Sequence, residues 1–147
     1  MFATRLIDKN TSRRAVRPAT ALIAFGLVAA ASSFAAGQVI DWNNPSGGQW
    51  SDAANWNPIN VPGAAAGESA RIAIAGTYTV SLDFNPTLDQ LLLTNPNATL
   101  NLNTLRTLIL LGVASTNDGL IRMNPQGSGN DAVLRFDSSG TLGGTGE

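Results

Sequence analysis

The hydrophobic and polar positions of this chain change their pattern twice, near residue 37 and near residue 70. Before the first point, an uncharged apolar run extends from Ala19 to Ala31. Residues 38–69 then follow no regular period and are rich in Asn, Gly and Pro, which is typical of turns. From residue 70 onward, short runs alternate apolar and polar positions, the period of two that indicates β-strands. The pattern thus predicts three segments, 1–36, 37–69 and 70–147.

The third segment is predicted to form a succession of short strands separated by Asn, Asp, Gly and Pro. The candidate strands are residues 70–75, 77–82, 88–93, 99–102, 105–111, 120–123 and 132–136. Such a chain, with almost no charged positions between the strands, favours stacked β structure over exposed helices, which need Glu and Lys on their wet face. The fold class predicted is therefore all-β.

Some of these strands resemble one another at intervals near twenty residues. Residues 87–93 resemble residues 104–110, seventeen positions on, and residues 100–103 resemble 121–124, twenty-one positions on. Recurrence on this scale indicates the coils of a solenoid. Because the two intervals differ, a β-sandwich, whose strands recur every 8–12 residues or so, stays open as the alternative. Arg122 and Arg135 take the polar position of similar strands, so we expect either a basic stripe on one face or two solvated side chains.

The first segment is predicted to be a helical signal peptide, residues 1–36. Its apolar run of about thirteen residues is too short for a membrane span, which needs about 20. Basic residues precede this run and small residues follow it, as in a cleavable secretion signal: Arg5, Lys9, Arg13, Arg14 and Arg17, then Ser33, Ala35 and Gly37. A buried helix is the less favoured reading. The pair Arg13-Arg14 resembles the twin-arginine export pattern, although general secretion remains the default.

Removing this leader changes the charge of the chain. The remaining residues keep four Arg, no Lys and nine acids, for a net charge of −5. This balance argues against nucleic acid and against anionic membrane surfaces as partners. The whole chain has no Cys and no His, which excludes thiol nucleophiles, Cys/His zinc sites and Ser-His-Asp triads. No metal, cofactor or stable transmembrane span is predicted.

The acidic residues give no catalytic pattern. They occur singly, mostly beside turn residues, whereas glycoside hydrolysis needs two facing carboxylates and a calcium loop needs several acids at alternating positions. Turn formation is the common role of such Asp residues. We therefore expect no enzyme activity.

The tryptophans of the second segment carry the one binding hypothesis. Trp50 and Trp56, with Asn55 and Asp52 beside them, would suit stacking on a glycan. The favoured alternative is that both rings pack inside the protein, because Trp is highly buried on average.

The same segment resembles a known opening of large exported bacterial proteins. The residues that carry the resemblance are Trp42, then Gly48-Gln49-Trp50-Ser51-Asp52-Ala53-Ala54-Asn55-Trp56, then Val61-Pro62-Gly63, then Gly67-Glu68-Ser69-Ala70-Arg71-Ile72. Autotransporter-like and adhesin-like surface proteins show a similar "G-x-W-S-x-A-x-N-W … V-P … G-D-x-A-x-I" run, with Asp where this chain has Glu68. The resemblance implies a right-handed parallel β-helix whose open first coil is covered by this segment.

In proteins of that kind, a run such as Leu142-Gly143-Gly144-Thr145-Gly146 opens a further coil. We therefore expect a solenoid cut short at its C-terminus, with a tail that frays because an unstacked coil must meet an ordering cost of about 1–2 kcal/mol per residue. The predicted domains are a signal peptide (1–36), a tryptophan-rich cap (37–69) and solenoid coils (70–147). The expected function is a secreted or cell-surface, non-catalytic structural or adhesive segment, the alternative being a carbohydrate-binding or carbohydrate-active module.

Overall fold

The computed structural model describes residues 37–127 and 129–147. The predicted signal peptide lies outside these residues. The described part is built almost wholly of short strands, and its one helix is a single 3-10 turn, η1 (Ala53–Asn55). No helix in residues 37–127 and 129–147 is long and apolar enough to cross a membrane. The prediction of an all-β fold is confirmed.

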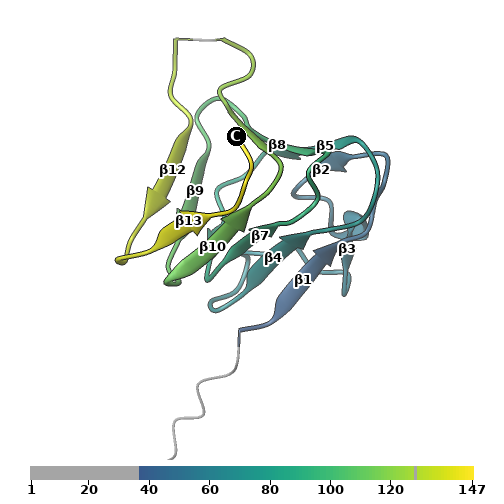
Figure 1. Ribbon diagram of the computed structural model, residues 1–147, viewed down its shortest axis with the longest axis horizontal. Coiled ribbons are helices and arrows are strands. Elements are labelled where there is room, and N and C mark those ends of the chain that lie inside the picture. Colours follow the sequence, from purple (N-terminus) through teal and green to yellow (C-terminus); the bar gives the residue numbers. More distant parts are fainter. Residues whose placement is uncertain (1–36, 128) are drawn as a thin grey trace, which may run out of the picture. The chain divides into compact units, whose positions relative to one another are not determined.

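The strands form three sheets, which we call A, B and C (Figure 1). Sheet A has the strand order β13-β10-β7-β4-β1-β3, sheet B the order β11-β8-β5-β2 and sheet C the order β12-β9-β6. The bounds in sheet A are β1 (Val39–Trp42), β3 (Trp56–Asn57), β4 (Ser69–Ile72), β7 (Leu91–Leu93), β10 (Ala114–Asn117) and β13 (Thr141–Gly143). The bounds in sheets B and C are β2 (Gly48–Gln49), β5 (Tyr78–Leu82), β8 (Ala98–Leu102), β11 (Leu120–Met123), β6 (Thr87–Leu88), β9 (Thr107–Leu110) and β12 (Val133–Phe136).

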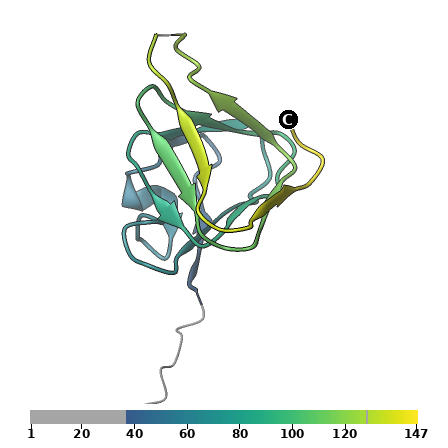
Figure 2. The same cartoon turned by 90° about the vertical axis from the view of Figure 1, so that its left-hand side faces the viewer.

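The sheets are parallel and their strands belong to successive coils of a β-solenoid. Each strand pairs with the strand one coil away, such as β5 with β8 and β9 with β12. Three coils visit all three sheets: β4-β5-β6, β7-β8-β9 and β10-β11-β12. They superimpose around a common interior when the stack is seen roughly end-on (Figure 2). Within the described residues only β1 and β3 pair antiparallel. The β-sandwich alternative is therefore wrong.

One of the two sequence intervals matches the pairing of neighbouring strands in the solenoid. Leu100 pairs with Ile121 and Leu102 with Met123, which confirms the interval of twenty-one. The interval of seventeen is wrong, because Leu88 pairs with Leu110, twenty-two positions on. The candidate strand 88–93 is in fact two strands, β6 and β7, on different sheets. A corner at Asp89 and Gln90 separates them, and periodicity alone cannot distinguish such a corner from a continuing strand.

Of the two alternatives for Arg122 and Arg135, the basic stripe is wrong, and both side chains are exposed. Arg122 lies on β11 in sheet B, whereas Arg135 lies on β12 in sheet C and forms an ion pair with Asp137, with Nε 2.6 Å from Oδ1. The two strands resemble each other because both alternate inward and outward residues. They belong to different sheets, so their arginines are not stacked on one another.

The cap segment contains more regular structure than its composition predicts. Strand β1 begins sheet A, where Ile40 pairs with Ala70 of β4. Strand β3 then returns antiparallel along the outer edge of β1, where Trp42 pairs with Trp56. The segment is thus the first coil of the solenoid and also the cover of its edge. Strands β10 and β13, rich in Ser, Thr, Asn and Gly, have too weak an apolar alternation to be predicted.

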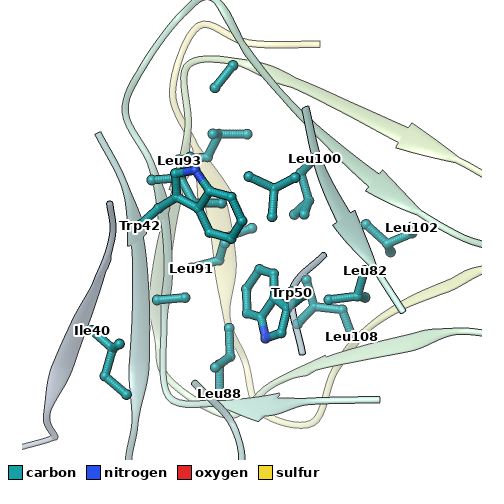
Figure 3. Packing of buried hydrophobic residues seen from close by; sticks show 14 of the residues in the cluster. Ile40, Trp42, Trp50, Leu82, Leu88, Leu91, Leu93, Leu100, Leu102 and Leu108 are labelled. Atoms are coloured by element: carbon teal, nitrogen blue, oxygen red, sulfur yellow. The ribbon is translucent and has the colours of Figure 1, made fainter. Parts of the chain in front are cut away.

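The interior is a stack of inward-facing apolar side chains. Alternate residues of each strand point inward, and the same inward positions recur in neighbouring coils, as at Leu82, Leu102 and Met123 in sheet B. Figure 3 shows the resulting cluster, with Trp42 and Trp50 among the leucines. The side chains that are fully buried and largest are Trp50, Trp56, Ile40, Ile72, Leu82, Leu88, Leu91, Leu93, Leu100, Leu102, Leu108 and Leu110.

The C-terminal tail pairs with the last coil, whereas the sequence led us to expect a tail without a partner. Strand β13 pairs with β10, where Leu142 lies opposite Ser115. Beyond β13, the amide of Thr145 donates to the Asp118 carboxylate (3.0 Å). Glu147 donates to the Gly119 carbonyl (3.0 Å) and accepts from the Ile121 amide (2.8 Å). Backbone hydrogen bonds to the coil below offset the ordering cost of this single layer.

Candidate functional site in the first coil

The three tryptophans of the cap segment form one buried cluster. The rings of Trp42 and Trp56 meet edge to face with centroids 4.9 Å apart, and those of Trp50 and Trp56 with centroids 4.8 Å apart. Such contacts add about 0.5–1.5 kcal/mol per pair beyond the burial of ring area. Relative exposures of 2 % or less leave these side chains no free ring face. The cluster fills the interior at the N-terminal end of the stack.

Each indole N–H in this cluster has a backbone partner. Trp50 donates to the Pro62 carbonyl (3.0 Å) and Trp56 donates to the Trp50 carbonyl (2.8 Å). Trp42 donates to the Asn44 carbonyl (2.6 Å). A buried donor without a partner would cost about 1–3 kcal/mol. These bonds therefore fix the orientation of the rings and also tie the Val61-Pro62-Gly63 turn to the tryptophan cluster.

The polar residues between Trp50 and Trp56 hold the connecting turn. Asp52 is the N-cap of η1, and its carboxylate accepts from the Ala54 amide (3.0 Å). Asn55 is buried, donates to the Gln49 carbonyl (3.0 Å) and accepts from Asn44 (2.8 Å). Both side chains thus satisfy backbone groups of the turn that carries the rings.

Ser51 links the first coil to the second. Its amide donates to Asp83 Oδ1 (2.9 Å) and its hydroxyl to Asp83 Oδ2 (2.5 Å). Asp83 follows β5 directly, so this link lies where the chain of the second coil leaves sheet B. The sequence did not single out Asp83, because a lone Asp after a strand is a common turn residue.

Glu68 is the centre of a second set of bonds. It is buried, and its carboxylate accepts from Asn60 Nδ2 (2.6 Å) and from the amides of Gly63 (2.9 Å) and Ala65 (3.0 Å). A carboxylate that accepts several N–H bonds forms strong, charge-assisted contacts. Gly63 has a φ of 87°, and a Cβ there would lie 2.5 Å from Pro86 Cβ of the neighbouring coil. The glycine lets the turn lie against the coil, and Glu68 holds the turn there.

The outer face of the first coil carries an exposed ion pair. Arg71 donates through Nε to Asp41 Oδ1 (2.5 Å) and through a terminal nitrogen to Oδ2 (2.9 Å), across the paired strands β1 and β4. The hydrogen bond to Asp41 and its negative charge raise the pKa of Arg71. Both side chains are more than a third exposed, so solvent screens the pair and its contribution to stability is small.

Tyr78, in the second coil, donates its hydroxyl hydrogen to the Ile74 carbonyl (3.0 Å). Burial raises the pKa of the Tyr78 phenol, and a hydrogen bond with Asn95 partly opposes this rise. The ring is buried, so the hydroxyl belongs to the corner between sheets A and B rather than to an open surface.

The remaining acidic residues do not converge. Among the residues that the structure describes, no three Asp or Glu side chains lie together as a metal site would require, and no pocket is present there. Asp137 is paired with Arg135, and Asp118 accepts from Thr145. These acids therefore act locally, as turn and strand partners.

The structure brings Trp50, Trp56 and Asn55 together, as expected, but with their functional groups facing inward. Asp52 lies at the surface beside them and bonds to its own turn. In this arrangement a sugar has no ring face to stack on. Residues that the sequence did not single out, above all Glu68 and Asp83, complete the bonding of the motif.

The fold and the bonding of the first coil define this chain as a parallel β-solenoid with a tryptophan-rich closing segment. Comparisons with protein-family models, with curated proteins and with solved structures find no match.

Proposed function

We propose that the protein is an exported, non-catalytic structural or adhesive surface segment, in which a β-solenoid is closed at its N-terminal end by the tryptophan-rich coil. The observation that carries the proposal is the bonding of the motif. The polar atoms of Trp50, Asn55, Trp56 and Glu68 form hydrogen bonds with the protein itself, to backbone groups and to the side chains of Asn44 and Asn60. Because its hydrogen bonds are made within the protein, the motif stabilises the first coil.

Closing this end of the stack has a physical purpose. The first coil of a solenoid leaves an apolar end and an unpaired sheet edge, both of which promote aggregation. Here β3 pairs with the edge of β1, and the tryptophan cluster fills the end of the interior. The resemblance of the motif to autotransporter-like and adhesin-like proteins supports a surface location, as does the predicted leader.

The first test separates a structural role of the tryptophans from carbohydrate binding. We expect Trp50→Ala and Trp56→Ala each to lower the free energy of unfolding by about 3–5 kcal/mol, as truncation of a buried Trp does. Ile59→Ala is the matched control, because Ile59 lies in the same segment but is 80 % exposed. Chemical unfolding and a glycan array are run on the same samples. Loss of glycan binding by variants that stay folded would favour the carbohydrate-binding alternative.

The second test concerns export. Mass spectrometry of the protein recovered outside the cytoplasm is expected to find a new N-terminus close to residue 37. Recovery of the intact leader on cytoplasmic protein only would contradict the proposed location, without affecting the role of the tryptophans.

A further inference from the structure

The described chain enters the first coil beside a carboxylate that has no partner. Gly37 is the first residue that the structure describes, and Asp89 lies at the corner between β6 and β7, at the end of the second coil. We propose that Asp89 is the binding site of the chain's own new N-terminus, whose α-ammonium group becomes free when the leader is removed. The inference rests on the proposed export, because only removal of the leader creates this group.

The surroundings of Gly37 place it against Asp89. A Cβ on Gly37 would lie 3.6 Å from Asp89 Oδ2, and it would collide with the Gly67 carbonyl oxygen, so only a glycine fits here. The next residue is also held, because the Gln38 carbonyl accepts from the Ser69 amide (2.8 Å). Gly37 is therefore part of the fold, and a chain that begins at or just before it has its N-terminus at this corner.

Asp89 is a partly buried carboxylate that has no hydrogen-bond or ion-pair partner in the described residues. Its neighbours at the corner, Gly37 and Gly112, have no side chain to offer. The other carboxylates of residues 37–127 and 129–147 that are at least partly buried each accept a hydrogen bond: Asp41, Glu68, Asp83 and Asp118. A charge removed from water without a partner is costly. The position of Asp89 therefore favours a nearby cation.

No side chain of the described residues is placed to supply that cation. Two of the four arginines, Arg71 and Arg135, are already held in ion pairs. Arg122 lies on β11 in sheet B and Arg106 at the corner between sheets B and C, whereas Asp89 lies at the corner between sheets C and A. The chain from residue 37 onward has no lysine and no histidine. The α-ammonium group of the processed chain is the cation that remains.

The expected cleavage site puts this group within reach of Asp89. Ser33 and Ala35 supply the small residues three places and one place before a cut, so processing there leaves a single residue ahead of Gly37. One residue spans about 3.5 Å, so the ammonium can reach the carboxylate without any change in the coils. A cut after Gly37 itself would remove a residue that packs in the fold.

The pair would join the beginning of the first coil to the end of the second. The other charged residue at this corner is Glu68, whose carbonyl accepts from the Asp89 amide (2.7 Å) and whose carboxylate is bonded within its own turn. One coil further on, Asp137 is paired with Arg135. Before processing, the nitrogen that becomes the ammonium is part of a neutral peptide bond. Removal of the leader therefore creates a contact that stabilises the first coil.

The charge state of the new N-terminus can be measured by itself. Because Lys9 lies in the leader and no other lysine exists, an amine-specific acetylating reagent modifies one group of the exported chain. The pH dependence of the acetylation rate gives the pKa of the α-amine in the folded protein and in urea. We expect a pKa about one unit above the ordinary 7.7–8.0 in the folded protein, because a carboxylate favours the charged form. Equal pKa values in folded and unfolded protein overturn the proposal.

Two variants identify the partner of the amine. Asp89→Asn should return the pKa of the α-amine to its ordinary value in protein whose tryptophan fluorescence shows it to be folded. Asp131→Asn, in an exposed loop, is the matched control and should leave the pKa raised. A raised pKa in folded Asp89→Asn protein overturns the assignment to Asp89.

Acetylation of the wild type removes the charge without any substitution. We expect it to lower the folding equilibrium constant about tenfold between pH 6 and 7, since a pKa shift of one unit corresponds to that factor. The raised pKa means that this stabilisation is complete below about pH 8 and is lost as the pH rises through the folded-state value, so both forms should be equally stable above about pH 10. Equal stability at pH 6 overturns the inference. An intact leader would instead contradict the proposed export, whereas a processed chain with an ordinary amine contradicts only the role of Asp89.

Discussion

At the scale of single residues, buried polar groups with several partners decide the stability of the first coil. Glu68 is the clearest case. A Glu in a motif position where Asp is expected looks like a neutral variation in the sequence, yet its carboxylate holds Asn60, Gly63 and Ala65.

We expect Glu68→Ala to lower the free energy of unfolding by about 3 kcal/mol, because it removes the charged acceptor of three hydrogen bonds. Glu68→Gln should cost less, since the amide keeps one acceptor oxygen. The control is Asp131→Ala in the exposed loop between β11 and β12, with an expected change within about 0.5 kcal/mol. Urea unfolding followed by tryptophan fluorescence measures all three variants. Equal stability of Glu68→Ala and the control would refute the role given to Glu68.

Tyr78 gives a prediction about alkaline pH. Its pKa is raised by burial, so the folded state holds the phenol proton more tightly than the unfolded state does. The corresponding stability is complete below the ordinary pKa near 10 and is lost as the pH rises through the folded-state pKa.

We therefore expect the free energy of unfolding to fall above about pH 10 in the wild type and to fall less steeply in Tyr78→Phe. At neutral pH this variant should be about 1 kcal/mol less stable, through loss of the bond to the Ile74 carbonyl. Tyr78 is the only tyrosine of the chain, so the difference between the two proteins reports on this phenol. Parallel slopes for the two proteins between pH 8 and 11 would contradict the assignment.

At the scale of elements, burial depends on whether a strand has neighbours on both sides. Register partners Leu100 and Ile121 occupy the same inward position in successive coils. Leu100 is fully buried, whereas Ile121 is only partly buried at the edge of sheet B. The same inward position therefore contributes a different free energy of burial in different coils.

We expect Leu100→Ala to cost about 3 kcal/mol and Ile121→Ala to cost about 1 kcal/mol, because a truncation near solvent leaves a smaller cavity and removes less buried area. Chemical unfolding of both variants at low protein concentration measures the difference for the monomer. A larger cost at Ile121 would show that the distal coil is covered more completely than the structure indicates.

At the scale of the whole molecule, the solenoid is a linear stack in which each coil contacts its neighbours. Strand β3 and the tryptophans cover the first coil, whereas β11, β12 and β13 each pair with a strand on one side only. Unfolding should therefore begin at the distal coil.

Native-state hydrogen exchange tests this order. The amides of β8 and β9 should exchange only on global opening, and those of β12 at a lower free energy. The amides of Thr141 and Glu147, which are bonded to the neighbouring coil, should exchange more slowly than that of Gln126, in the exposed loop that follows β11. Faster exchange at β8 than at β12 would contradict an end-first order.

Much of this architecture was predictable because it follows from local chemistry. Alternation with a period of two marked the strands around Val80, Leu100 and Leu134, and one repeat interval gave the true register at Leu100 and Ile121. The burial of Trp50 and Trp56 followed from their size and apolar area. The corner at Asp89, which splits one apolar run between two sheets, was not predictable, because a corner residue and an outward strand residue are both polar.

The sequence by itself thus determined an all-β chain with coil-like repeats, and it showed that the aromatic residues gather in one turn-rich segment. Only the tertiary structure decided which strands share a sheet and where the polar groups of that segment point. It also decided which end of the stack is closed. The physical reason is that inward and outward alternation is a local property of each strand, whereas pairing, corner position and partner choice depend on residues twenty or more positions away.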